Sequence, residues 1–239
     1  MSHAPKTQRN VPIMLFRNVM NRVMVIRQWH CILSYAILFL KTVIKGFLMI
    51  KGEKMTTLRW TSRDLEVMPD DGKRYEVVDG ELYVSKQPHY HHQLVCSRLV
   101  ALLDAWSSQT KAGDATFAPG LIFADDDDVA PDVIWISRER RATALQADGK
   151  LHSAPELVIE VLSPGAANEH RDREAKLKLY SRRGVQEYWV VSWQERYLEI
   201  YQRERAMLKL NRTLYETDML ESPLLPGFSC QVNQIFAGI

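Results

Sequence analysis

The chain has 239 residues, a length that suits one ordinary domain or one domain with an appendage. Hydrophobic residues make up 46% and charged residues 25% of the chain, which is typical of globular proteins and excludes a disordered or collagen-like chain. The net charge of +2 hides an asymmetry, because residues 1–54 carry nine Lys or Arg and one acid, whereas residues 55–239 have a net charge of −6. The overall basic character therefore does not predict a nucleic-acid surface on the remainder.

The three cysteines, Cys31, Cys96 and Cys230, are odd in number and far apart in the sequence. This pattern argues against a disulfide framework or a zinc ribbon and fits a reducing compartment. We therefore expect a cytoplasmic protein.

The first 54 residues contain one continuous apolar stretch, Trp29–Leu40, of about twelve residues. A membrane-spanning helix needs roughly 20 residues, and extending the stretch would bury Lys41 and Lys45. Three interpretations stay open: an over-extended gene start before Met55, a poorly packed or membrane-touching tail, and a spanning helix. We favour the first, which makes residues 1–54 an N-terminal extension and 55–239 the folded domain, with no stable membrane association.

Periodicity and turn signals in the first half of the domain predict a short capped helix, a hairpin around Asp79-Gly80 and a long helix. A strand, a solvated acidic turn, a second strand and a charged helix follow. In chain order, these elements are 61–66, 74–85, 89–107, 116–123, 125–128, 132–136 and 138–146.

The second half begins with a buried strand, indicated by its continuous apolar run, and a helix that ends at Gly184. Three more strands follow. These elements are 156–162, 169–183, 186–192, 197–202 and 207–215. Together the elements predict a mixed sheet flanked by helices, an α/β or α+β fold.

Glu160 lies inside the apolar run Leu157–Leu162, where an unpaired carboxylate would cost several kcal/mol to bury. A cation partner, a hydrogen-bond network, a raised pKa or a metal must compensate. Asp132 opens the preceding strand, 28 positions earlier, which leaves room for one strand, one helix and the return. The two strands are therefore expected to be neighbours, with both acids at one end of the sheet. Two such carboxylates suit Mg²⁺ or Mn²⁺, although Asp132 alone would also fit an ordinary strand start.

The helix after Glu160 carries Asp172, Lys176 and Tyr180 at i, i+4 and i+8, which places them on one face. A solvated Asp–Lys pair is the simpler interpretation. The same helix contains six Lys or Arg between 171 and 183, which makes it the domain's plausible phosphate-contacting surface.

Three histidines, His89, His91 and His92, precede the long helix, and capping and surface roles are favoured over a soft-metal site. The sequence lacks a Gly-rich phosphate loop, a nucleotide fingerprint and a nucleophile elbow.

An ordered series of motifs resembles the Uma-two family of putative restriction endonucleases, in the PD-(D/E)XK nuclease superfamily. The resemblance covers about Trp60 to Phe236, and its motifs are Arg74–Leu82, His92-Gln93, Pro131–Val133, Leu157–Pro164, Asp172…Lys176…Tyr180 and Gly184–Trp189. It implies a restriction-endonuclease-like mixed sheet flanked by helices.

The resemblance also implies a metal-dependent endonuclease acting on DNA. Asp132 and Glu160 would be the motif acids that hold Mg²⁺ or Mn²⁺, with Glu76 and His92 as supporting residues. The lysine usually found two positions after the Glu is Leu162 here, and Lys176 on the following helix takes its place. DNA is the expected partner, and a homodimer is one option.

Two other functions stay open. A catalytically degenerate relative would bind nucleic acid or a partner protein, which Leu162 in the lysine position favours. Another two-carboxylate hydrolase, such as a glycosidase, would leave Lys176 and the basic helix without a role.

Overall fold

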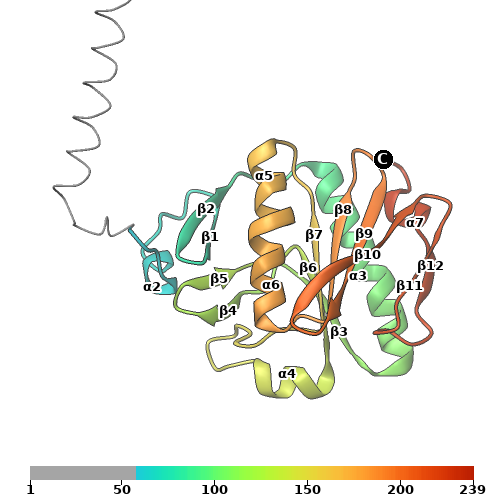
Figure 1. Cartoon of the computed structure of the whole chain (residues 1–239), viewed down its shortest axis with the longest axis horizontal. Coiled ribbons are helices and arrows are strands. Elements are labelled where there is room, and N and C mark those ends of the chain that lie inside the picture. The colour runs from blue at the N-terminus through green and yellow to red at the C-terminus, as the bar shows by residue number, and fades with distance from the viewer. Residues whose placement is uncertain (1–57) are drawn as a thin grey trace, which may run out of the picture. The chain divides into compact units, whose positions relative to one another are not determined.

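A six-stranded mixed sheet forms the centre of the computed structural model, which describes residues 58–239 (Figure 1). Its strand order is β10-β9-β8-β7-β6-β3. The strands are β3 (Gly113–Phe117), β6 (Val133–Ser137), β7 (Leu157–Val161), β8 (Glu187–Ser192), β9 (Tyr197–Glu204) and β10 (Met207–Tyr215). Within this sheet β7 and β8 run parallel, and the other neighbours are antiparallel. The predicted fold class is confirmed.

Parallel neighbours need a crossover connection, usually a helix. Here the crossover between β7 and β8 is a helical run in three parts: α5 (Ala166–His170), the π-helical segment η1 (Arg171–Lys176) and α6 (Leu177–Arg183). It ends at Gly184, whose φ of 90° is the left-handed cap expected of glycine. This run covers one face of the sheet, and α3 (Tyr90–Thr110) covers the other (Figure 1).

A second, four-stranded sheet has the order β2-β1-β5-β4. The hairpin of β1 (Arg74–Val78) and β2 (Glu81–Ser85) turns at Asp79 and Gly80, with φ values of 54° and 74°, as the Asp-Gly dipeptide predicts. The other two strands are β4 (Leu121–Ala124) and β5 (Asp127–Val129).

The remaining elements are short. Thr61 caps α2 (Ser62–Leu65) in a capping box with Asp64, as predicted. The other elements are α4 (Arg138–Ala144), β11 (Met219–Glu221), β12 (Ser229–Gln231) and α7 (Asn233–Phe236).

The core is divided by the six-stranded sheet, because side chains alternate along a strand. In β7, Leu157, Ile159 and Val161 pack in the cluster that contains the α3 side chains, whereas Val158 packs with Leu179 from α6. Glu160 is two positions after Val158, so it points to the same face of the sheet. Its side chain therefore faces the crossover helix.

Two sequence predictions in the middle of the chain are wrong. The single strand expected at 116–123 is two strands, β3 and β4, in different sheets, because Ala118 has a φ of 49° and the turn pair Pro119-Gly120 follows. The solvated turn at 125–128 is also incorrect, since Asp127 and Asp128 are buried in β5.

The predictions for residues 1–54, and the boundary after residue 54, lie outside the described residues. In the part of the chain that the structure describes, no helix is both long and apolar enough to cross a membrane.

Candidate active site

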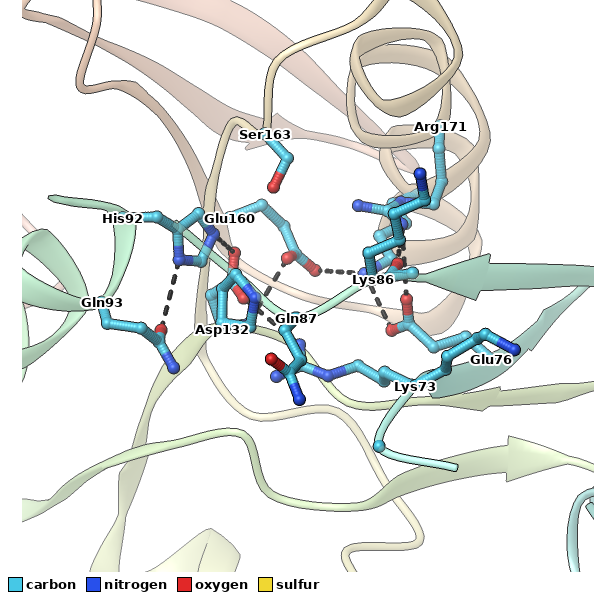
Figure 2. A pocket seen from close by; sticks show the side chains of 15 residues that line it. Lys73, Glu76, Lys86, Gln87, His92, Gln93, Asp132, Glu160, Ser163 and Arg171 are labelled. Atoms are coloured by element: carbon cyan, nitrogen blue, oxygen red, sulfur yellow. Dashed lines mark hydrogen bonds and ion pairs between the residues drawn. The ribbon is translucent and has the colours of Figure 1, made fainter. Parts of the chain in front are cut away.

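A cleft of about 190 Å³ lies at the end of the central sheet where β7 leads into the crossover (Figure 2). His92 reaches it from one side and Glu76 and Arg171 from the other, with Asp132 and Glu160 between them. The cleft therefore collects side chains from α3, both sheets and the crossover helix.

Asp132 and Glu160 are brought together by strand pairing. β6 and β7 are antiparallel with Val133 opposite Ile159, so continuing the register places Asp132 opposite Glu160. The backbone N–H of Val161 donates to Asp132 Oδ2 at 2.9 Å, and the N–H of Asp132 lies 3.4 Å from Glu160 Oε2. The expectation that neighbouring strands hold both acids at one end of the sheet matches this geometry.

Lys176 lies between two buried carboxylates. Its Nζ is 2.9 Å from Glu160 Oε1 and 2.9 Å from Glu76 Oε1, and all three side chains are almost fully buried. The Tyr180 hydroxyl also donates to Glu160 Oε1, at 2.8 Å. Because the crossover helix leaves β7 just after Glu160 and returns over the same face, its side chains reach this carboxylate.

The helix that carries Lys176 departs from the predicted regular α-helix. Residues 171–176 are π-helical, a distortion that is frequent at functional sites. The Tyr188 hydroxyl donates to the backbone oxygen of Asp172 at 2.9 Å, and the Asp172 carboxylate accepts from Arg171 Nε at 2.8 Å. Of the three residues predicted on one face, Lys176 and Tyr180 contact Glu160, whereas Asp172 pairs with Arg171.

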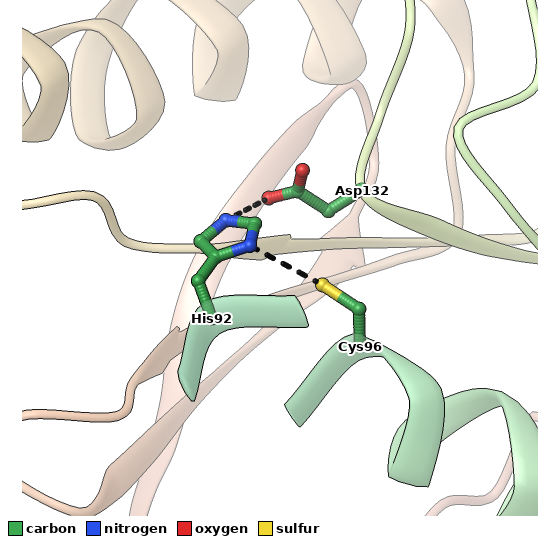
Figure 3. A group of neighbouring side chains, drawn as sticks. All are labelled: His92, Cys96 and Asp132. Carbon is green, nitrogen blue, oxygen red and sulfur yellow. Dashed lines mark hydrogen bonds and ion pairs between the residues drawn. The ribbon is translucent and has the colours of Figure 1, made fainter. Parts of the chain in front are cut away.

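His92 and Cys96 form a second group around Asp132 (Figure 3). His92 Nε2 lies 3.2 Å from Asp132 Oδ2, and Cys96 Sγ lies 3.7 Å from His92 Nδ1. The sequence interpretation missed Cys96, although its i, i+4 spacing from His92 on a predicted helix was a usable signal. His89 has the predicted capping role, since its Nδ1 accepts from the His91 N–H at 3.1 Å.

Most of the basic side chains on the crossover helix are held by acids of the fold. Arg171 pairs with Asp172, and Arg173 pairs with Glu199. Both Arg182 and Arg183 contact the buried Asp127. The helix is therefore not the open phosphate-contacting surface that its composition indicated.

Burial and neighbouring charges shift the pKa values of Asp132, Glu160 and Lys176. Burial opposes the charged form of Asp132, but His92, Lys176 and Arg74 outweigh it and hold the pKa well below its usual range. Burial raises the pKa of Glu160 to about 8, against the opposing charge of Lys176 and with a contribution from Asp132. Burial would lower the pKa of Lys176, yet Glu160 and Glu76 outweigh that effect and raise it. The lysine therefore remains a cation.

Each acid uses one oxygen for short hydrogen bonds and leaves the other with weaker contacts. Asp132 Oδ2 accepts from Val161 at 2.9 Å, whereas Oδ1 has only Arg74 Nη1 at 3.3 Å among the described residues. Glu160 Oε1 binds Lys176 and Tyr180, whereas Oε2 has the 3.4 Å contact to the Asp132 N–H. Two such carboxylate oxygens are the hard ligands that Mg²⁺ and Mn²⁺ prefer, so the donor set fits.

Comparisons with known proteins found one family model and a similar solved fold. A family model, Uma2, described as putative restriction endonuclease, matches residues 62–233. A crystal structure of a putative nuclease belonging to DUF820 from Anabaena variabilis is similar in fold, with 15% identity and a TM-score of 0.60 over 74% of this chain and 97% of that one. No curated protein matches the chain. Because the family match covers most of the sequence, this protein belongs to the Uma2 family of putative restriction endonucleases.

Proposed function

We propose that the protein is an endonuclease that hydrolyses phosphodiester bonds in DNA with the help of Mg²⁺ or Mn²⁺. One observation carries the proposal: Asp132 and Glu160 lie on paired strands in a cleft, each with one weakly bonded oxygen, and the buried cation Lys176 is 2.9 Å from Glu160. The nuclease family and the nuclease-like fold support it.

Asp132 Oδ1 and Glu160 Oε2 would hold the metal ion. When bound, a divalent ion neutralises charge on the scissile phosphate and lowers the pKa of a nearby water. The chain's own contribution is to fix the two ligands, since His92 and the Val161 N–H hold Asp132 while Lys176 and Tyr180 hold Glu160.

Lys176 would stabilise the negative charge that the phosphoryl oxygens carry in the transition state. A general base needs a depressed pKa, whereas the neighbouring acids raise the pKa of this lysine, so an electrostatic role is favoured. Its contact with Glu160 also supports Lys176 as the replacement for the lysine that Leu162 displaces. Glu76 positions Lys176 from the other side.

The test is cleavage of supercoiled, linear and single-stranded DNA by the full chain with Mg²⁺, with Mn²⁺ and with chelator. We expect metal-dependent cleavage that Asp132→Asn and Glu160→Gln each reduce by about 10³-fold or more, since losing a ligand forfeits several kcal/mol of charge stabilisation. Asp148→Asn, which removes a carboxylate at an exposed turn, is the matched control and should cleave normally.

Cleavage that survives in both cleft variants would refute the proposal. Metal-independent binding of DNA without cleavage would favour the catalytically degenerate relative instead.

A further inference from the structure

A group of aromatic rings lies beside the cleft at the start of α3. His89 stacks on Trp193 with ring centroids 4.8 Å apart and an interplanar angle of 12°, and His91 meets Trp193 edge-on at 5.4 Å. The Tyr90 ring is 5.9 Å from that of His91 and is 73% exposed. These four residues are called the aromatic patch below.

The patch adjoins the cleft at the start of α3, and its Trp193 lies at the same edge of the sheet as the cleft acids. Pro88 and His92, which flank the three consecutive patch residues His89–His91, line the cleft. Trp193 directly follows β8, and β8 pairs in parallel with β7, the strand that carries Glu160. Because parallel strands end at the same edge of a sheet, Trp193 and the acids belong to the same edge.

The opposite side of the cleft mouth is basic. It is formed by the open end of the β1–β2 hairpin, where Lys73 and Lys86 line the cleft (Figure 2). Arg74, the first residue of β1, also lines the cleft. Lys86 is exposed, and Lys73 is 47% exposed beside Asp71. A nucleic-acid strand that crosses the cleft would therefore contact cations on one side and aromatic rings on the other.

This pairing of a basic rim with exposed rings is the arrangement by which proteins bind nucleic acid whose bases are unpaired. A duplex keeps its base faces stacked inside and presents phosphates and base edges. Exposed rings such as that of Tyr90 therefore gain little from a duplex, whereas each can stack on a free base.

We propose that the aromatic patch binds unpaired bases next to the scissile phosphate, so that the substrate is single-stranded or locally unpaired DNA. The proposal rests on the proposed function, because it assigns the substrate class of the same cleft.

The test is fluorescence anisotropy of the full chain, without metal, on a labelled single-stranded oligonucleotide and on its blunt duplex. Tyr90→Ala should weaken single-strand affinity about five- to tenfold and leave duplex affinity unchanged, because one stacked base is lost. Tyr90→Phe keeps the ring and should bind normally. Tyr215→Ala, which removes a 58% exposed tyrosine on β10, is the matched control and should have no effect.

Lys86→Met separates phosphate binding from stacking, since it should weaken both substrates alike. If Tyr90→Ala and His91→Ala bind single strands like the parent, or weaken both substrates equally, the patch does not bind bases. Selective loss of single-strand binding in a protein that cleaves no DNA would uphold the patch and refute the proposed function. Cleavage of duplex DNA that neither variant changes would do the reverse.

Discussion

The buried carboxylate of Asp127 differs from the two cleft carboxylates, Asp132 and Glu160, in how completely its oxygens are hydrogen-bonded. Asp127 in β5 is saturated: Oδ1 accepts from the Asp79 N–H at 2.8 Å and Arg182 Nη2 at 2.7 Å, and Oδ2 accepts from Arg182 Nη2 at 2.8 Å and Arg183 Nε at 3.0 Å. Both arginines reach it from the end of the crossover helix. The ion pairs of Asp127 with these two arginines therefore join the four-stranded sheet to the crossover helix.

The oxygens of Asp132 and Glu160 are hydrogen-bonded less completely, although both side chains are also buried. Each anchors one oxygen and leaves the other with contacts of 3.3–3.4 Å. A buried acid with full pairing stabilises a fold, whereas a fixed acid with an open oxygen is suited to a ligand. We therefore propose a structural role for Asp127 and a functional role for Asp132 and Glu160, and the two roles predict different effects of substitution.

The largest effect on stability should come from Lys176→Met. It removes the cation between Glu76 and Glu160, so turnover should fall by about 10²–10³-fold, as when one preorganised charge donor is lost. Two buried carboxylates also lose their partner, so the free energy of unfolding should fall by about 3–5 kcal/mol. Single-turnover cleavage and urea unfolding measure the two effects.

Lys209→Met is the control for this substitution, because Lys209 is 61% exposed on β10 and pairs with Glu204. It should change neither cleavage nor stability measurably. Normal turnover of Lys176→Met would remove the lysine from the proposed mechanism.

A smaller effect, confined to stability, is expected for Asp127→Asn. The change leaves Arg182 and Arg183 without their carboxylate, but both are partly exposed and can be hydrated, so the loss in unfolding free energy should be about 2–3 kcal/mol. Cleavage per folded molecule should be unchanged. A loss of activity that exceeds the loss of folded protein would contradict the division between the two groups.

The smallest change is the pH dependence of that stability difference. Burial would raise the pKa of Asp127, but the Asp79 N–H and the two arginines outweigh burial and hold the pKa below its usual value. A depressed pKa contributes stability that is complete above the unfolded pKa of about 3.9 and is lost as pH falls through the folded pKa. Denaturant unfolding should therefore show a constant difference in unfolding free energy between the parent and Asp127→Asn down to about pH 5. This difference should become smaller below about pH 4. A difference in unfolding free energy that grows as the pH falls would contradict this prediction.

Sequence patterns predicted the proximity of Asp132 and Glu160, but they did not predict the burial of Asp127. The apolar run around Glu160 and the 28-residue spacing from Asp132 are local signals, and strand pairing turns them into proximity. Asp127 was misassigned to a solvated turn because its partners, Arg182 and Arg183, lie 55 and 56 positions away. Such distant pairing has no local signature.

The same limit applies to the crossover helix. Its hydrophobic spacing and terminal glycine predicted a helix ending at Gly184, but the π-helical segment depends on contacts such as the Tyr188 hydroxyl with the Asp172 backbone. The four-stranded sheet was also missed, because β5 has three residues and two of them are Asp. Predictions failed where tertiary partners override local propensity.

The difference between the two carboxylate groups is tested most directly by melting temperature with and without Mn²⁺. A ligand that binds only the folded state raises its stability by mass action, so the parent should melt at a higher temperature with metal. Asp132→Asn and Glu160→Gln should lose this rise, whereas Asp127→Asn should melt lower but retain it. A full metal-induced rise in both cleft variants, or its loss in Asp127→Asn alone, would contradict the assignment of the metal site to Asp132 and Glu160.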